Sequence, residues 1–80
     1  MFYVYLLESE SVAGQRYIGY TRDLRARLRA HNAGLAGHSA KFVPWRLVFY
    51  SAFSSEQKAH DFERYLKTGS GQAFASKRFW

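Results

Sequence analysis

Glu63 is the residue whose type and position first suggest chemistry. It lies four residues after Ala59 and three before Leu66, inside what reads as the apolar stripe of a helix. A carboxylate that faces a core is costly unless it is paired or binds a cation. Glu63 could have a structural role, either in an ion pair, for example with Arg27, or at the edge of the stripe where it reaches water. Alternatively, it could be a metal ligand. The helix pattern alone favours the structural role.

Arg27 and His31 form a second unusual pair. They are four residues apart on an expected helix, so both project from the same side. His31 also continues the row of Leu28, at the border of the buried face. An arginine and a histidine at such a border could stabilise an anionic transition state, or they could be ordinary boundary residues. Arg25 and Arg29, displaced around the helix, suit contacts with backbone phosphates.

Three tyrosines could add hydroxyl groups to such a site. Tyr3 and Tyr5 fall on the same face of an expected first strand, because side chains alternate along a strand. Tyr17 lies on an expected second strand, and across a hairpin it could face one of them. Buried hydroxyls need hydrogen-bond partners. A purely structural packing role fits the same pattern.

The charge of the chain points to a polyanion partner. Its 80 residues hold 12 Lys and Arg against 6 Asp and Glu, a net charge of +6. Between residues 16 and 46, seven basic residues face one acidic residue, and all but Lys41 are arginines. Arginine favours planar, bidentate contact with phosphate, and a concentrated basic field is typical of nucleic-acid binding. The alternative is a solvated basic face.

Cysteine is absent, which excludes disulfides, zinc ribbons and thiolate catalysis. A small chain without such crosslinks fits a reducing cytosol, so a cytoplasmic location is expected. The apolar N-terminus lacks a basic start and reaches Glu8 too soon for a signal peptide. No apolar run approaches the roughly 20 residues that span a bilayer, so no membrane partner is expected.

The elements that must position these residues follow from local patterns. Aromatic and branched runs predict strands at residues 2–7, 16–20 and 45–53, with the first two paired as a hairpin. A helix is predicted from residue 22 to about 33, with Thr21 as its N-cap and Gly34 as its stop. Residues 34–44 are predicted to form a loop.

The last third of the chain is predicted to be helical. Ser54 and Gln57 have the capping-box spacing, which predicts a helix from there to about Thr68. Gly69–Gly71 is expected to break the chain before a helical piece at residues 72–79. The order β-β-α-β-α-(α) predicts an α+β fold, a small three-stranded antiparallel sheet flanked by helices, in a single domain over residues 1–80.

The sequence resembles the GIY-YIG endonuclease superfamily, and especially its small single-domain bacterial members. Tyr3-Val4-Tyr5 stands where the Gly-Ile-Tyr element lies, and Tyr17-Ile18-Gly19 matches Tyr-Ile-Gly in full. Arg27 and His31 stand ten and fourteen residues after Tyr17, at the family's positions. Glu63 occupies the position of the family's metal-binding glutamate. The resemblance covers essentially the whole chain.

The resemblance implies a one-metal phosphodiesterase site. Glu63 would hold Mg²⁺ or Mn²⁺, and the metal would polarise a phosphate oxygen and stabilise the leaving group. Tyr17 would assist deprotonation of the attacking water, which requires cationic neighbours because free tyrosine titrates near pH 10. Arg27 would neutralise charge on the phosphoryl group. Tyr5 and His31 would position water or relay protons.

The expected function is therefore a divalent-metal-dependent endonuclease that hydrolyses DNA, with structure-directed action in repair or processing as one expectation. The alternatives are a non-catalytic nucleic-acid-binding module with this fold and a basic protein-interaction domain. Some relatives carry an asparagine beyond the metal glutamate, whereas the one asparagine of this chain is Asn32. The basic side chains expected to contact nucleic acid are Arg16, Arg22, Arg25, Arg29, Lys41 and Lys67.

Overall fold

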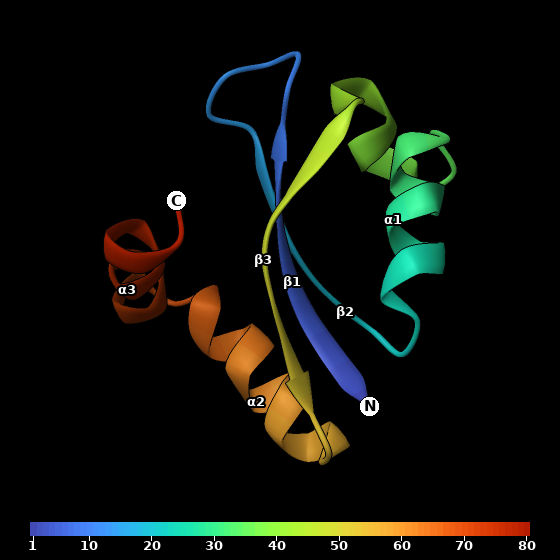
Figure 1. The fold of residues 1–80 in the computed structure, drawn as a ribbon. Helices are drawn as coiled ribbons and strands as arrows, with labels where there is room; N and C mark the ends of the chain where they lie inside the picture. Colours follow the sequence, from blue (N-terminus) through green and yellow to red (C-terminus); the bar gives the residue numbers. More distant parts are fainter.

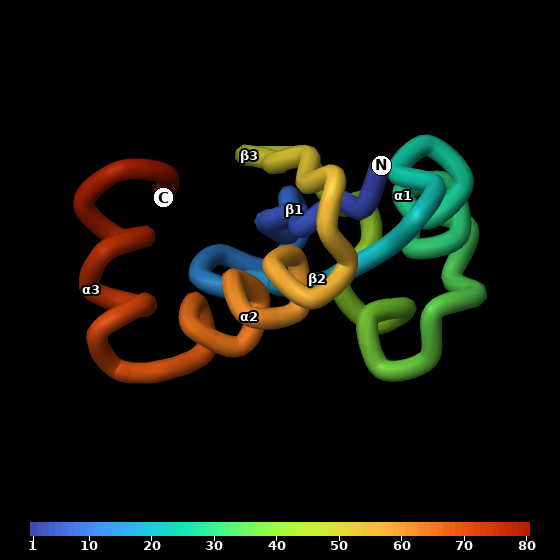
Figure 2. Tube along the Cα trace, turned by 90° about the horizontal axis from the view of Figure 1, so that it is seen from below, coloured from blue at the N-terminus to red at the C-terminus, as the bar shows by residue number.

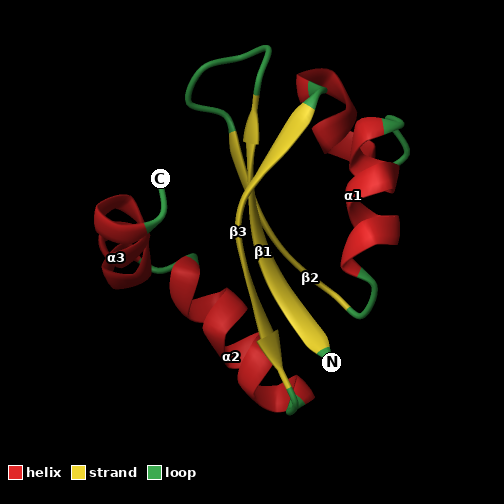
Figure 3. Cartoon of the chain, viewed as in Figure 1, coloured by secondary structure: helices red, strands yellow, loops and turns green.

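The computed structural model describes residues 1–80 and has three layers (Figures 1 and 3). Helix α1 lies on one side of a central sheet, and α2 and α3 lie on the other. The predicted α+β class and element order are confirmed. The elements are β1 (Phe2–Ser9), β2 (Arg16–Thr21), α1 (Leu24–Asn32), the 3-10 helix η1 (Gly37–Phe42), β3 (Trp45–Phe53), α2 (Glu56–Leu66) and α3 (Gly69–Arg78).

The sheet is antiparallel with the order β2-β1-β3, so β1 is its central strand. Both neighbours and both helical layers cover β1, which explains its nearly continuous apolar sequence. Val4, Tyr5, Leu6 and Leu7 are at most 1% exposed. In the register, Tyr5 lies between Gly19 of β2 and Tyr50 of β3.

Alternation along β1 divides the core into two clusters. Val4 and Leu6 pack with Ala59, Leu66 and Ala75 of the two C-terminal helices. Tyr5 and Leu7 point to the other face, where they pack with Trp45 and the half-buried leucines of α1. Figure 2, seen from below, shows α1 and α3 on opposite sides of the strands. The sheet thus separates a core whose buried residues are all aliphatic from one whose buried residues include Tyr5 and Trp45.

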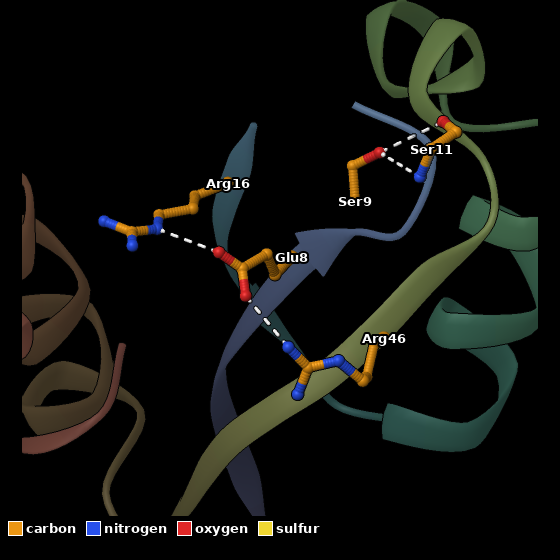
Figure 4. Close-up of polar contacts among 5 residues, drawn as sticks. All are labelled: Glu8, Ser9, Ser11, Arg16 and Arg46. Carbon is orange, nitrogen blue, oxygen red and sulfur yellow. Dashed lines mark hydrogen bonds and ion pairs between the residues drawn. The ribbon is translucent and has the colours of Figure 1, made fainter. Parts of the chain in front are cut away.

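One carboxylate ties the three strands together at one end of the sheet (Figure 4). Glu8 of β1 accepts from Arg16 Nε at 3.4 Å and from Arg46 Nη2 at 2.9 Å, on the two neighbouring strands. The next residue, Ser9, accepts from the backbone N–H groups of Ser11 and Val12 and so shapes the loop to β2. Exposed ion pairs contribute little stability, so Glu8 mainly orients the two arginines.

The helix starts differ from the sequence predictions by one or two residues. Asp23, not Thr21, is the N-cap of α1, and its Oδ1 accepts from Ala26 N at 3.1 Å. Thr21 instead accepts from Asp23 N. Ser55, not Ser54, caps α2 by accepting from Lys58 N. Adjacent Ser, Thr and Asp residues are all good caps, so the tertiary entry angle of the chain decides among them.

Two segments predicted as irregular are helical. Residues 37–42 of the expected loop form η1, and the expected break at Gly69–Gly71 is the first turn of α3, capped by Thr68. A Cβ at Gly71 would lie under 3.0 Å from backbone atoms of Tyr65 and Leu66. Glycine is therefore required there so that α3 can start directly against the end of α2.

None of the helices is long and apolar enough to cross a membrane.

Candidate active site

Tyr5 is the centre of a hydrogen-bonded network on the α1 face of the sheet. Its ring is buried, and its hydroxyl lies 2.9 Å from His31 Nε2. Arg27 Nε donates to the same oxygen at 3.3 Å. Helical spacing predicted only that Arg27 and His31 share a side of their helix, and Tyr5 was grouped with them through the family resemblance. The structure brings the three together from β1 and α1.

The hydrogen bonds around His31 have a defined direction. Ser39 Oγ donates to the carbonyl of Ala36 at 3.1 Å, so it must accept from His31 Nδ1, 2.8 Å away. With its proton on Nδ1, neutral His31 can only accept at Nε2. The Tyr5 hydroxyl therefore donates to His31, and its oxygen accepts from Arg27.

Burial keeps both members of this pair neutral near pH 7. Burial raises the pKa of Tyr5 to about 12, against the lowering effect of the Arg27 hydrogen bond. Burial, followed by the positive charge of Arg27, lowers the pKa of His31. A neutral imidazole that already accepts a phenol proton can take up a proton during a reaction and return it.

Tyr17 lies against this network from the edge strand β2. Its ring stacks on Tyr5 with centroids 6.0 Å apart, and it meets the His31 ring edge-on at 4.5 Å. The hydrogen bond with the Tyr5 hydroxyl raises the pKa of Arg27, and the Tyr17 hydroxyl adds a smaller increase. Arg27 has no carboxylate partner among the ion pairs of the chain. Its charge is therefore available to an incoming anion.

Gly19 is required by the packing of the two tyrosines. A Cβ at this position would lie under 3.0 Å from ring atoms of both Tyr5 and Tyr17. Gly19 is the residue of β2 that pairs with Tyr5 in the register. The glycine of the Tyr17-Ile18-Gly19 tripeptide thus allows the Tyr5 ring to cross directly over the backbone of β2.

Sequence reasoning missed Ser39 and Trp45. The indole Nε1 of Trp45 donates to the carbonyl of Ser39 at 2.9 Å, and its ring centroid is 6.3 Å from that of Tyr17. The side chain of Asn32 bonds to the backbone of Trp45. Asn32 therefore has a structural role, which fixes β3 against the end of α1.

Glu63 lies apart from this network. Its carboxylate accepts from Lys67 Nζ at 2.8 Å within α2, and its side chain is 19% exposed. The expected alternative of an ion pair with Arg27 is wrong, because helix α2 covers the other face of the sheet (Figure 1). Glu63 is instead an edge residue of the stripe, paired within its own helix.

The Glu63 carboxylate fits an open metal site, in which one protein ligand holds the ion. The chain has no cluster of three or more His, Asp or Glu side chains that could hold an ion. This excludes a closed, all-protein cage. Mg²⁺ is commonly bound through one or two carboxylates, with water and substrate phosphate oxygens completing the shell. A single half-buried glutamate fits that pattern.

The six basic residues predicted to contact nucleic acid divide into two groups. Arg16, Arg22 and Lys67 are paired with Glu8, Glu56 and Glu63. Arg25, Arg29 and Lys41 are exposed and have no carboxylate partner. The unpaired group lies on α1 and η1, the same side of the sheet as the Tyr5 network.

Comparison with known proteins identifies the class. The family model of the GIY-YIG catalytic domain matches residues 1–77. The fold is thus that of a small α+β catalytic domain of the nuclease class. The chain belongs to the GIY-YIG family, and the resemblance seen in its sequence is confirmed.

Relatives with the same small domain support this assignment. The chain is 39% identical over 66 residues to a UPF0213 protein of Streptococcus pneumoniae serotype 4, covering 81% of this chain and 65% of that protein. It is 38% identical over 72 residues to a UPF0213 protein of Streptococcus agalactiae serotype V, covering 89% and 80%. It thus spans just under two thirds of the first relative.

A solved structure supports the fold. The solution NMR structure of a UPF0213 protein from Bacillus halodurans has 31% sequence identity and a TM-score of 0.57. The match covers 98% of this chain and 86% of that one.

Proposed function

We propose that this chain is a divalent-metal-dependent endonuclease that hydrolyses phosphodiester bonds in DNA. The observation that carries the proposal is the network in which Arg27 and His31 hold the Tyr5 hydroxyl from two sides, next to Tyr17. Family membership supplies the reaction class. The net charge of +6 supplies the attraction to a polyanion.

Arg27 is the group we expect to contact the scissile phosphate. It carries an uncompensated charge and is held by the Tyr5 hydroxyl rather than by a carboxylate. A guanidinium that is preorganised in this way stabilises charge that develops on the phosphoryl oxygens without first breaking an ion pair. Electrostatic preorganisation is commonly the largest contribution to catalysis.

Tyr5 and His31 would position the attacking water and relay its proton. The direction of the hydrogen bonds places an acceptor at His31 Nε2 behind the Tyr5 hydroxyl. When the Tyr5 oxygen takes a proton from the water, Tyr5 can therefore pass its own hydroxyl proton to His31 Nε2. Tyr17, half-buried at the sheet edge and stacked on Tyr5, would assist deprotonation of the water.

Glu63 would hold the divalent ion, which when bound would polarise a phosphate oxygen and stabilise the leaving group. Helix α2 packs against β2, the edge strand that bears Tyr17. A phosphate at the edge of β2 would therefore be accessible from both sides of the sheet. Glu63 must exchange Lys67 for the metal, which leaves the Lys67 ammonium free for a DNA phosphate.

The test is cleavage of labelled single-stranded, duplex and flapped DNA in Mg²⁺ or Mn²⁺. Arg27→Ala and Glu63→Ala are each expected to abolish cleavage while circular dichroism shows an intact fold. Asp61→Ala is the matched control, because it removes an ion-paired carboxylate from the same helix. Cleavage that survives either of the first two substitutions would refute the assignment of that residue.

The second candidate function is a nucleic-acid-binding module without catalysis. The Glu63–Lys67 ion pair favours it, because a salt-bridged glutamate is a weaker metal ligand. DNA binding by the wild-type protein with no cleavage in either metal would establish this function in place of the nuclease. Structure-directed action would appear as faster cleavage of the flapped substrate than of the plain duplex.

A further inference from the structure

A groove of about 520 Å³ lies between the first turns of α1 and the sheet, on the same side as the Tyr5 network. It contains none of Tyr5, Tyr17, Arg27 or His31. Its size is within the range of small-ligand sites. Its apolar lining is Leu24, Leu28 and Leu47, and its aromatic and charged rim is Tyr3, Tyr50, Arg22, Asp23 and Arg25.

The aromatic rim is formed by Tyr3 of β1 and Tyr50 of β3. The ring centroids are 6.2 Å apart and the planes are inclined at 58°, so the rings do not cover each other's faces. Tyr50 is 52% exposed, although it lies in a strand next to the core. Neither hydroxyl has a hydrogen-bond partner in the chain, and the exposed Tyr50 ring is accessible to a ligand.

The charged rim is positive. Arg25 has no carboxylate partner, and Arg22 reaches Glu56 only at 3.8 Å. The acidic residue of the groove, Asp23, is engaged as the N-cap of α1, where it accepts from Ala26 N. The groove thus combines free aromatic faces with at least one uncompensated guanidinium.

We infer that this groove binds one unpaired base of the DNA strand, with a neighbouring phosphate on Arg25. Exposed aromatic rings beside cations are the usual means of binding single strands, because every base has a face that can stack. A base within a duplex is already stacked on both faces and cannot enter. The inference deepens the proposed function and rests on it for the identity of the nucleic acid.

The position of the groove relates it to the cleavage site. Tyr3 and Tyr5 are two residues apart on the same face of β1, about 7 Å along the strand. Leu28 of the groove directly follows Arg27 on α1. A base held by Tyr3 and Tyr50 would therefore belong to a nucleotide close to the phosphate at Arg27. The groove would favour cleavage at single-stranded or flapped positions.

The test is the affinity of the full chain for a labelled 15-nucleotide single strand and for the same sequence as a duplex, measured in EDTA so that no cleavage occurs. Tyr50→Ala is expected to weaken single-strand binding about tenfold and duplex binding less than about twofold. Tyr50→Phe, which keeps the ring, should bind like the wild type. Tyr65→Ala is the matched control, a 40% exposed tyrosine on α2.

Three results would overturn the inference: equal weakening for both DNAs by Tyr50→Ala, the same loss in Tyr65→Ala, or no single-strand binding by the wild-type protein. Cleavage in Mg²⁺ is measured separately. Selective loss in Tyr50→Ala without any wild-type cleavage would support the groove and refute the nuclease. Cleavage by the wild type without selective loss in Tyr50→Ala would support the nuclease and refute the groove.

Discussion

At His31, the two ring nitrogens have partners of opposite character. Nδ1 donates to Ser39, whose own proton is used on a backbone carbonyl, and Nε2 accepts from Tyr5. Each bond therefore fixes the next, from η1 through α1 to β1. The neutral tautomer that results is the one able to act as a base toward Tyr5.

The buried His31 gives the stability of the protein a defined pH dependence. Its pKa is lowered in the folded state, whereas the unfolded chain titrates near pH 6.5. As pH falls through about 6.5, the unfolded state gains a proton before the folded state does, so the free energy of unfolding must decrease. The slope is at most about 1.4 kcal/mol per pH unit for one proton.

Urea unfolding between pH 7.5 and 5.5 measures this loss. His31→Gln should be less stable at pH 7.5 but should lose this contribution to the slope, whereas His38→Gln, at an exposed position of η1, should retain it. A slope that is unchanged in His31→Gln would show that some other group titrates in this range.

Gly19→Ala tests the contact between the β2 backbone and the Tyr5 ring. The added methyl group has no space, because ring atoms of Tyr5 and Tyr17 lie within 3.0 Å of its position. Overpacking of this kind costs about 1–3 kcal/mol, which urea unfolding would detect. If the clash is with Tyr5, the double variant Gly19→Ala, Tyr5→Leu should lose less than the sum of the single losses; strict additivity would contradict this explanation.

At the residue scale, the sequence predicted the positions of site residues that lie in segments with a helical or strand period. Helical spacing placed Arg27 and His31 on one side of their helix, whereas their contact with Tyr5 depends on the tertiary fold. Ser39 was missed because it lies in a segment without periodicity, and Trp45 because it stands at the start of a strand next to that segment. Only the tertiary fold brings Ser39 to His31 and Trp45 to Ser39. A buried serine in a glycine-rich segment gives no local signal.

At the scale of elements, the strands were predictable and the helix junctions were not. Aromatic and branched runs located all three strands to within two residues, because β-propensity and burial coincide there. The start of α3 was missed because glycine normally weakens a helix. At Gly71 that penalty is offset by close approach to α2, which no local pattern encodes.

Gly71→Ala should therefore detach α3 from the rest of the fold. A methyl group there would overlap the backbone of Tyr65 and Leu66, so α3 must shift and its contacts with the sheet are lost, including the stacking of Phe79 on Phe49. We expect a loss of about 1–3 kcal/mol in the free energy of unfolding.

Gly69→Ala is the matched control for this junction, since a Cβ at Gly69 has no atom within 4 Å. It should leave stability unchanged or raise it by up to about 1 kcal/mol. Equal destabilisation by both substitutions would mean that helix propensity, rather than close packing, governs the junction.

At the scale of the whole molecule, the sheet separates the Tyr5 network from the helix that bears Glu63. Three unpaired cations, Arg25, Arg29 and Lys41, lie on the network side. Binding to DNA should therefore release counterions and weaken with salt. Arg25→Ala should reduce the slope of log K against log salt by about 1. Arg64→Ala should leave it nearly unchanged, because Arg64 is paired with Asp61.

Anisotropy titrations between 50 and 200 mM salt in EDTA measure this slope. A flat dependence in the wild-type protein would contradict a nucleic-acid role and favour a protein-interaction domain.

The central claim is that the Tyr5 hydroxyl, held by Arg27 and His31, takes part in phosphodiester cleavage. Single-turnover cleavage by Tyr5→Phe tests it most directly, because the substitution removes one oxygen and keeps the buried ring. Tyr65→Phe is the control, because it removes one phenol oxygen from a tyrosine of α2 outside both the network and the groove. We predict that Tyr5→Phe slows cleavage at least about 100-fold at unchanged DNA affinity, with Tyr65→Phe near the wild-type rate. A Tyr5→Phe rate within about twofold of wild type would contradict the claim.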